Sequence, residues 1–227
     1  MTRITRVYSR AEQWMDRIVH WCGITGAVVG VVAMMIVAGV VAHGDALLWA
    51  SLVVYSVGLV GMLGCSALCN HDLTDSSHWA GLFQRLDHAG ILLMIAATYT
   101  PLTLHVMGGT TGWILFAFVW LIALTGMAIR LFRREPLKPR SSLALYLVLG
   151  WSVVFALQPL VSSASLVVLV LILVGGGLYS VGVPFYLWKR LPFHNAIWHA
   201  FVVAAAACHY AAVLIGVALT GGVASSS

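Results

Sequence analysis

The sequence predicts an all-α integral membrane protein, a bundle of seven transmembrane helices. Of its 227 residues, 61% are hydrophobic and only 8% are charged, whereas a soluble domain carries roughly 25% charged residues. A hydrocarbon core about 30 Å thick requires roughly 20 apolar residues of helix, because backbone polar groups inside lipid must be paired within the segment. Seven segments meet this requirement: Val19–Ala42, Ala46–Cys69, His88–Val106, Thr111–Arg130, Ser142–Val161, Ser165–Trp188 and Ala196–Thr220.

The positions of the basic residues predict the orientation of these helices. When the loops are numbered alternately from the N-terminus, all 12 lysines and arginines fall on the same side as the N-terminus. Cytoplasmic loops carry an excess of lysine and arginine, so we expect a cytoplasmic N-terminus and an external C-terminus. Residues 1–18 are then a cytoplasmic segment, residues 19–220 the transmembrane domain and residues 221–227 a short external tail.

The basic loops do not indicate nucleic-acid binding. Nucleic-acid binding requires a basic groove with interleaved aromatic residues, and the loops of this chain do not provide one. Basic residues next to the bilayer are instead attracted to anionic headgroups of the inner leaflet. Membrane lipids are therefore the expected partners.

Polar and ionisable side chains gather near the expected cytoplasmic ends of four helices. Residues four apart share one helix face, and three pairs here have that spacing. Ionisable groups are costly within a bilayer, so they usually face the bundle interior and mark a functional site. The alternative is that the residues cap helices or reach interfacial water, and the two aspartates in particular suit helix N-caps. The residues are Asp16 and His20, Ser66 and Asn70, Asp87, and Asn195 and His199.

Five stretches of the chain carry a distinctive pattern. They are SALCNH (Ser66–His71), LDHAGILLMIAATYTP (Leu86–Pro101), GGGLYSVGVPFY (Gly175–Tyr186), NAIWHAFVVAAAACHY (Asn195–Tyr210) and E-x-x-x-D-x-x-x-H (Glu12–His20). Together they resemble the hemolysin III family, the bacterial branch of the progestin and adipoQ receptor superfamily. The resemblance implies a seven-helix bundle with a cytoplasmic N-terminus in a bacterial inner (plasma) membrane.

The resemblance also implies a zinc ion near the cytoplasmic face. In the family, one histidine at the end of the second helix and two at the start of the last helix bind the ion, with an aspartate and a serine nearby. Ser66, Asp87 and His199 occupy three of these positions. Asn70 and Asn195 stand where the family has the other two histidines, and an amide oxygen is a poor ligand for zinc. The family's zinc site is therefore not expected intact.

A different set of side chains offers a replacement site for zinc or another divalent ion. His71 and His194 stand beside the two asparagines, but each residue turns a helix by about 100°, so His194 and His199 cannot chelate one ion from a regular helix. Two imidazoles and two carboxylates from three helices suit a divalent ion better. This candidate metal site comprises Asp16, His20, Asp87 and His199.

The alternative, which the sequence favours, is a metal-free hydrogen-bond network in which Asn70 and Asn195 bridge Asp87 and His199. Two classes of function remain open. The first is a non-catalytic, lipid-sensing or membrane-active role, such as the cytolysis that the family name implies. The second is a metal-dependent lipid amide hydrolase, similar to a ceramidase, in which Asp87 would take a proton from metal-bound water. The missing histidines favour the first class and leave enzymatic activity open.

Overall fold

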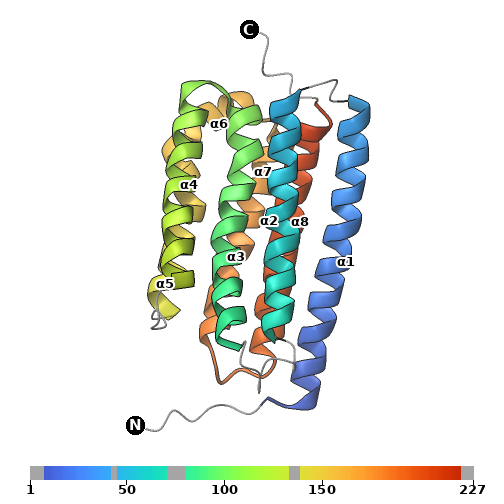
Figure 1. Ribbon diagram of the computed structural model, residues 1–227, viewed down its shortest axis with the longest axis vertical. Helices are drawn as coiled ribbons and strands as arrows, with labels where there is room; N and C mark the ends of the chain where they lie inside the picture. The colour runs from blue at the N-terminus through green and yellow to red at the C-terminus, as the bar shows by residue number, and fades with distance from the viewer. Residues whose placement is uncertain (1–7, 42–44, 71–79, 133–138, 221–227) are drawn as a thin grey trace.

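The computed structural model describes residues 8–41, 45–70, 80–132 and 139–220, and its regular elements are helices (Figure 1). Within these ranges, seven segments are long and apolar enough to cross a membrane, which confirms the predicted fold class. The elements are α1 (Arg10–Val41), α2 (Ala46–Asn70), α3 (Ala80–Pro101), η1 (Leu102–Met107), α4 (Gly109–Phe132), α5 (Pro139–Gly150), η2 (Trp151–Ala156), α6 (Leu157–Ser163), α7 (Leu166–Leu187), α8 (His194–Val213) and η3 (Leu214–Ala218).

Three of the seven spans change their helical geometry along their length. The third span is α3 followed by the π-helical segment η1, and the fifth is α5, the 3₁₀ segment η2 and α6. The seventh span is α8 followed by the π-helical segment η3. The first change follows Pro101, because proline has no N–H to donate to the preceding turn. The hydroxyls of Thr100 and Thr103 donate to backbone carbonyls beside it, at 2.8 Å each.

Two helices begin well before the hydrophobic segments suggest, by two turns or more: α1 at Arg10 and α3 at Ala80. At the start of α1, the backbone N–H of Ser9 donates to Glu12 Oε2 at 2.9 Å and the backbone N–H of Glu12 donates to Ser9 Oγ at 3.2 Å. This reciprocal pair is a capping box, which sets a helix start independently of hydrophobicity. Asp16 and Asp87 therefore lie inside helices, and the interpretation of both as helix N-caps is wrong.

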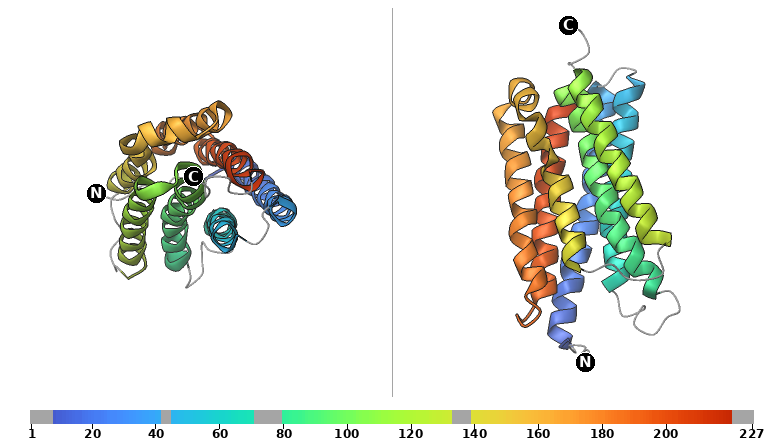
Figure 2. Two further views of the ribbon diagram at one scale, coloured as in Figure 1. Left: turned by 90° about the horizontal axis from the view of Figure 1, so that it is seen from above. Right: turned by 90° about the vertical axis from the view of Figure 1, so that its left-hand side faces the viewer.

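The first and last spans lie side by side in the bundle. α1 packs against both α2 and α8, while α2 packs against α3 and α7 against α8. The views in Figures 1 and 2 agree on this order. α1 begins and η3 ends at opposite ends of the bundle (Figure 1). We call the end at which α1, α3, α5 and α8 begin the basic end, because its described basic side chains are Arg10, Arg17, Arg85, Arg130, Lys189 and Arg190.

The outer surface of the bundle is apolar. Phe155, Phe132 and Leu166 are 89%, 83% and 76% exposed, and they lie on three different helical elements. An exposed apolar surface of this extent is unfavourable in water but matches the hydrocarbon of a bilayer. The helices therefore contact membrane lipids over most of their outer faces.

Small residues allow the second and third spans to approach closely. A Cβ added at Gly58 would overlap the Cβ of Ala97 on α3. Small residues at such contacts let the helix backbones approach, which is a common basis of helix packing in membranes. This close contact holds α2 and α3 as one wall of the interior.

A candidate metal centre at the basic end

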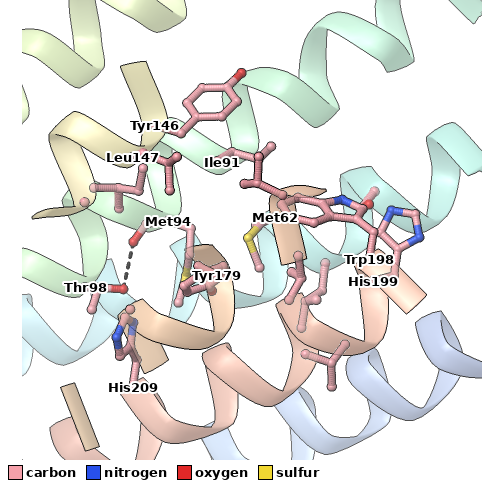
Figure 3. Close-up of a pocket in the computed structure, with 18 of the residues that line it drawn as sticks. Met62, Ile91, Met94, Thr98, Tyr146, Leu147, Tyr179, Trp198, His199 and His209 are labelled. Atoms are coloured by element: carbon pink, nitrogen blue, oxygen red, sulfur yellow. Dashed lines mark hydrogen bonds between the residues drawn. The ribbon is translucent and has the colours of Figure 1, made fainter. Parts of the chain in front are cut away.

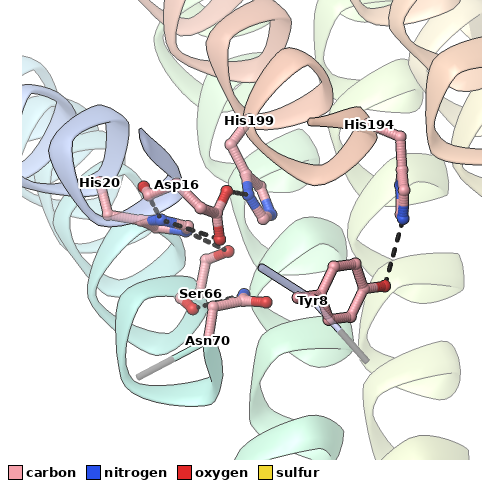
Figure 4. A network of polar contacts seen from close by, with 7 residues as sticks. All are labelled: Tyr8, Asp16, His20, Ser66, Asn70, His194 and His199. Carbon is pink, nitrogen blue, oxygen red and sulfur yellow. Dashed lines mark hydrogen bonds and ion pairs between the residues drawn. The ribbon is translucent and has the colours of Figure 1, made fainter. Parts of the chain in front are cut away.

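Three side chains that can bind metal meet inside the basic end of the bundle. Asp16 and His20 come from α1, and His199 comes from the second turn of α8 (Figure 4). One ligand atom of each residue lies within 4.8 Å of the corresponding atoms of the other two. All three residues are buried, with exposed fractions of 7%, 6% and 9%. The contact between α1 and α8 thus assembles a compact group from opposite ends of the chain.

Hydrogen bonds fix which ring nitrogen carries the proton in each histidine. Nδ1 of His199 lies 2.6 Å from Asp16 Oδ1, and Nδ1 of His20 lies 2.8 Å from the backbone oxygen of Asp16. Carboxylate and carbonyl oxygens accept hydrogen bonds, so both Nδ1 atoms donate. A neutral ring then has a lone pair on Nε2. Nε2 of His20 accepts from the Ser66 hydroxyl at 3.3 Å, whereas Nε2 of His199 has no partner among the described residues.

Asp87 lies near this group without joining it. It lines the same cavity as His20, Ser66 and His199, but the compact group of metal-binding atoms does not include its carboxylate. One Asp87 carboxylate oxygen lies 3.9 Å from Nδ1 of His88. The structure therefore brings together three of the four residues of the candidate metal site and places the fourth on the wall of an adjoining cavity.

The cavity has a volume of about 140 Å³ and is enclosed mainly by apolar side chains. Its polar lining at the basic end includes His20, Ser66, Asp87 and His199, and its lining also includes His209 on α8 (Figure 3). His209 follows His199 by ten residues, which is about 15 Å along a helix. No sequence pattern predicts this cavity, because it forms between six of the seven spans and no single helix shows a polar face.

Comparison with known proteins identifies the family. A family model described as Haemolysin-III related matches residues 8–210. The chain belongs to the hemolysin III family. It is 34% identical to a hemolysin-3 homolog of Bacillus subtilis strain 168 over 208 residues, covering 92% of this chain and 95% of the relative. It is also 34% identical to hemolysin-3 of Bacillus cereus over 217 residues, covering 94% of each.

A mammalian protein is also similar to this chain, over a shorter range. The human monocyte to macrophage differentiation factor is 31% identical over 165 residues, covering 70% of this chain and 67% of the relative. This likeness agrees with the superfamily that the sequence motifs indicate. The seven spans and the bacterial relatives support a multi-pass protein of the inner (plasma) membrane.

The residues of this hemolysin III-family chain fit a divalent metal ion. A histidine that binds metal usually donates its other ring N–H to a carboxylate or a backbone carbonyl, and both His20 and His199 do so through Asp16. Two imidazole nitrogens and one carboxylate are a donor set that zinc accepts. Oδ2 of Asp16 makes no hydrogen bond among the described residues. Each of the three residues thus offers one possible ligand atom, and these atoms lie within 4.8 Å of one another.

The two asparagines at the family's ligand positions take no part in this group. Nδ2 of Asn70 donates to the backbone oxygen of Ser66 at 2.8 Å, and the side chain of Asn195 makes no hydrogen bond with any described residue. The expected bridge from Asp87 to His199 through these amides is therefore not found in the described part of the chain. The physical reason is local, because an asparagine side chain can hydrogen-bond to the backbone carbonyl four residues earlier in its own helix.

The other two predicted polar residues lie outside the compact group. His194 is completely buried at the first position of α8, and its Nε2 lies 3.1 Å from the hydroxyl oxygen of Tyr8 (Figure 4). It therefore contacts the segment that precedes α1. His71 lies outside the described residues.

A second contact at the basic end aligns α1 with α8. Oε1 of Glu12 accepts a hydrogen bond from the backbone N–H of Phe193 at 3.0 Å. Phe193 caps α8 with a φ of 59°, in the left-handed region, where residues other than glycine are uncommon. A carboxylate at a helix N-terminus also interacts favourably with the helix dipole. Glu12 thus ties the start of α1 to the start of α8, one turn before Asp16.

Proposed function

We propose that this hemolysin III-family protein binds an amphipathic lipid and senses it without chemical change. In this proposal His20 and His199, with Asp16, hold a divalent ion such as zinc at the basic end. The bound ion would supply a positive charge for the polar group of the lipid. The observation that carries the proposal is that the histidines of the compact group line an apolar cavity.

The burial of the three side chains supports a bound cation at this site. An ionised carboxylate is costly to bury unless it is paired, and Asp16 is 7% exposed and lies 2.6 Å from Nδ1 of His199. A cation held by Asp16 and the two histidines would complete this pairing. The apolar walls of the cavity, formed by side chains such as Met62, Ile91 and Val202, would exclude water and receive the hydrocarbon part of the lipid.

A hydrolase that cleaves lipid amides is the second candidate function. The observation that favours it is the position of Asp87 on the wall of the same cavity as His20 and His199. A metal ion supplies Lewis acidity and makes water a better nucleophile. The carboxylate of Asp87 would then accept a proton, which is a role for a general base.

One preparation tests both functions. The full chain is purified, reconstituted in lipid nanodiscs and loaded with zinc, and its affinity for a fluorescent fatty acid is measured. We expect saturable binding in the wild type, a loss of at least tenfold in His199→Ala, and unchanged binding in Asp45→Asn, which alters a carboxylate at the opposite end of α2. Absence of saturable binding in the wild type would contradict the proposal.

The same nanodiscs distinguish sensing from hydrolysis. Ceramide is added, and released fatty acid is quantified by mass spectrometry. The lipid-sensing proposal predicts no release above the level of His199→Ala. Release by the wild type that is lost in both Asp87→Asn and His199→Ala would establish the hydrolase instead.

We also propose that the basic end faces the cytoplasm, with residues 1–18 on that side and residues 221–227 outside. The support is the excess of basic residues at this end, which is typical of cytoplasmic loops. Alkaline phosphatase fused after Ser227 should be active in a bacterial host, because it folds only outside the cytoplasm. An alkaline phosphatase fusion at this position that is expressed but inactive would contradict the orientation.

A further inference from the structure

The end of the cavity remote from the candidate metal centre also carries polar groups. Thr98 of α3, Tyr179 of α7 and His209 of α8 line the cavity there. Figure 3 shows these three labelled side chains together, with Trp198 and His199 at the other side of the cavity. None of the three belongs to the compact group at the basic end.

His209 presents a hydrogen-bond acceptor. Its Nε2 lies 3.3 Å from the backbone oxygen of Ile172, and because a carbonyl only accepts, Nε2 carries the proton. Nδ1 of the neutral ring therefore has a lone pair, and it has no partner among the described residues. A free acceptor on a cavity wall within a membrane protein is unfavourable unless a donor pairs with it.

The packing of α7 fixes the orientation of this ring. A Cβ added at Gly175 would lie 2.5 Å from both Cδ2 and Nε2 of His209. The ring edge that carries these two atoms therefore packs directly on the backbone of α7, and the edge that carries Nδ1 faces away from it. Gly175 is the residue that permits this contact.

Thr98 adds a second acceptor at the same end. Its hydroxyl donates to the backbone oxygen of Met94 at 2.8 Å, so the proton is engaged and the lone pairs of Oγ1 remain. The Tyr179 ring lies 5.7 Å from the His209 ring, between centroids. Two acceptors beside an aromatic wall suit a ligand group that donates a hydrogen bond, such as a hydroxyl.

We infer that Thr98 and His209 form a second polar subsite, and that the ligand is an elongated amphiphile with an anionic group at one end and a hydroxyl at the other. This inference rests on the proposed function, which places the anionic group at the metal centre. His199 and His209 are about 15 Å apart along α8. An extended hydrocarbon chain advances about 1.3 Å for each C–C bond of about 1.5 Å, so roughly twelve bonds separate the two groups. An ω-hydroxy fatty acid has this structure.

Binding of 12-hydroxydodecanoate and of dodecanoate to the zinc-loaded full chain in nanodiscs tests the inference. The two acids differ only in the terminal hydroxyl. We expect the hydroxy acid to bind about five- to tenfold more tightly, which corresponds to one hydrogen bond. His209→Phe should abolish the preference, measured as the ratio of the two affinities in the same variant. His105→Phe is the control, because it removes a buried histidine bonded to Ser51 that does not line the cavity.

Two further variants keep the test decisive if His209→Phe does not fold. Thr98→Val preserves shape but removes one acceptor, and Gly175→Ala displaces the His209 ring. Both should reduce the preference for the hydroxy acid. Equal affinities for the two acids in the wild type, both lost in His199→Ala, would overturn the second subsite and leave the proposed function intact. Binding of neither acid would contradict both proposals.

Discussion

Nδ1 of His199 donates to Oδ1 of Asp16 across 2.6 Å, and this contact joins residues 183 positions apart in the chain. It connects the first and last membrane-crossing helices at a buried point. In the family pattern that the motifs suggest, the second and last helices would supply all the histidine ligands. In this chain α1 contributes His20 and Asp16 instead, and the two asparagines lie outside the group.

Replacing the carboxylate that orients the histidines should weaken metal binding. We expect Asp16→Asn to lower the affinity for zinc by about 10- to 100-fold, which is typical for a lost hydrogen-bond partner of a metal-binding histidine. Competition with a chromogenic chelator in detergent measures this affinity. Asp45→Asn is the matched control, because Asp45 Oδ1 accepts from the backbone N–H of Leu48 at the start of α2. Equal affinities in Asp16→Asn and the wild type would contradict a role for Asp16.

The capping box at the start of α1 should contribute measurably to stability. We expect Glu12→Ala to lower the free energy of unfolding by about 1 kcal/mol, because helix N-terminal hydrogen bonds are lost. Glu12→Gln should lose less, since glutamine can still reach the N-cap backbone. Thermal unfolding in detergent, followed by circular dichroism, compares the two. A Glu12→Gln variant as unstable as Glu12→Ala would argue against the capping role.

The hydroxyl of Tyr99 should stabilise the 3₁₀ segment of the fifth span. It donates to the backbone oxygen of Gly150 at 2.7 Å and accepts from the backbone N–H of Val153 at 2.8 Å. Tyr99→Phe would remove both of these hydrogen bonds, at a cost of about 1–3 kcal/mol. Tyr210→Phe removes a single hydrogen bond, to the backbone oxygen of Gly30, and should lower the free energy of unfolding by less. Parallel thermal unfolding of the two variants in detergent compares these losses. The reverse order would show that the segment does not depend on Tyr99.

The close contact between α2 and α3 should tolerate no larger residue at Gly58. Gly58→Ala would overlap Ala97, and overpacking of this kind costs about 1–3 kcal/mol. Gly64→Ala lies on the same helix with no atom within 4 Å, and it should be neutral or stabilising because alanine favours helix. Thermal unfolding of the two variants distinguishes packing from helix propensity. Equal stability of both would contradict the close contact.

The sequence predicted the number and approximate limits of the spans, because length and apolar composition determine which segments can cross a bilayer. It also predicted that Asp16 and His20 share one face, from their i,i+4 spacing. It missed the true start of α1, since the turns before Val19 are held by the hydrogen bonds of Ser9 and Glu12 rather than by hydrophobicity.

The neighbours of each helix could not be read from periodicity. Nothing in the local pattern shows that α1 packs on α8, so the contact between Asp16 and His199 was one of several pairings that the residues allowed. The side chain of Asn70 followed a local preference that competed with the expected long-range bridge. His209 was an isolated histidine in an apolar helix, and only the packed structure places it on a cavity with Thr98.

Metal analysis of purified protein tests the central claim most directly. Three proteins are compared: the full chain, its His20→Ala variant and its Asn70→Ala/Asn195→Ala double variant. Each is incubated with zinc, dialysed to remove weakly bound metal and analysed by mass spectrometry. We expect about one zinc per chain in the wild type and in the asparagine variant, and a loss of most of it in His20→Ala. Full metal content in His20→Ala, or its loss only in the asparagine variant, would show that the ion is not held between α1 and α8.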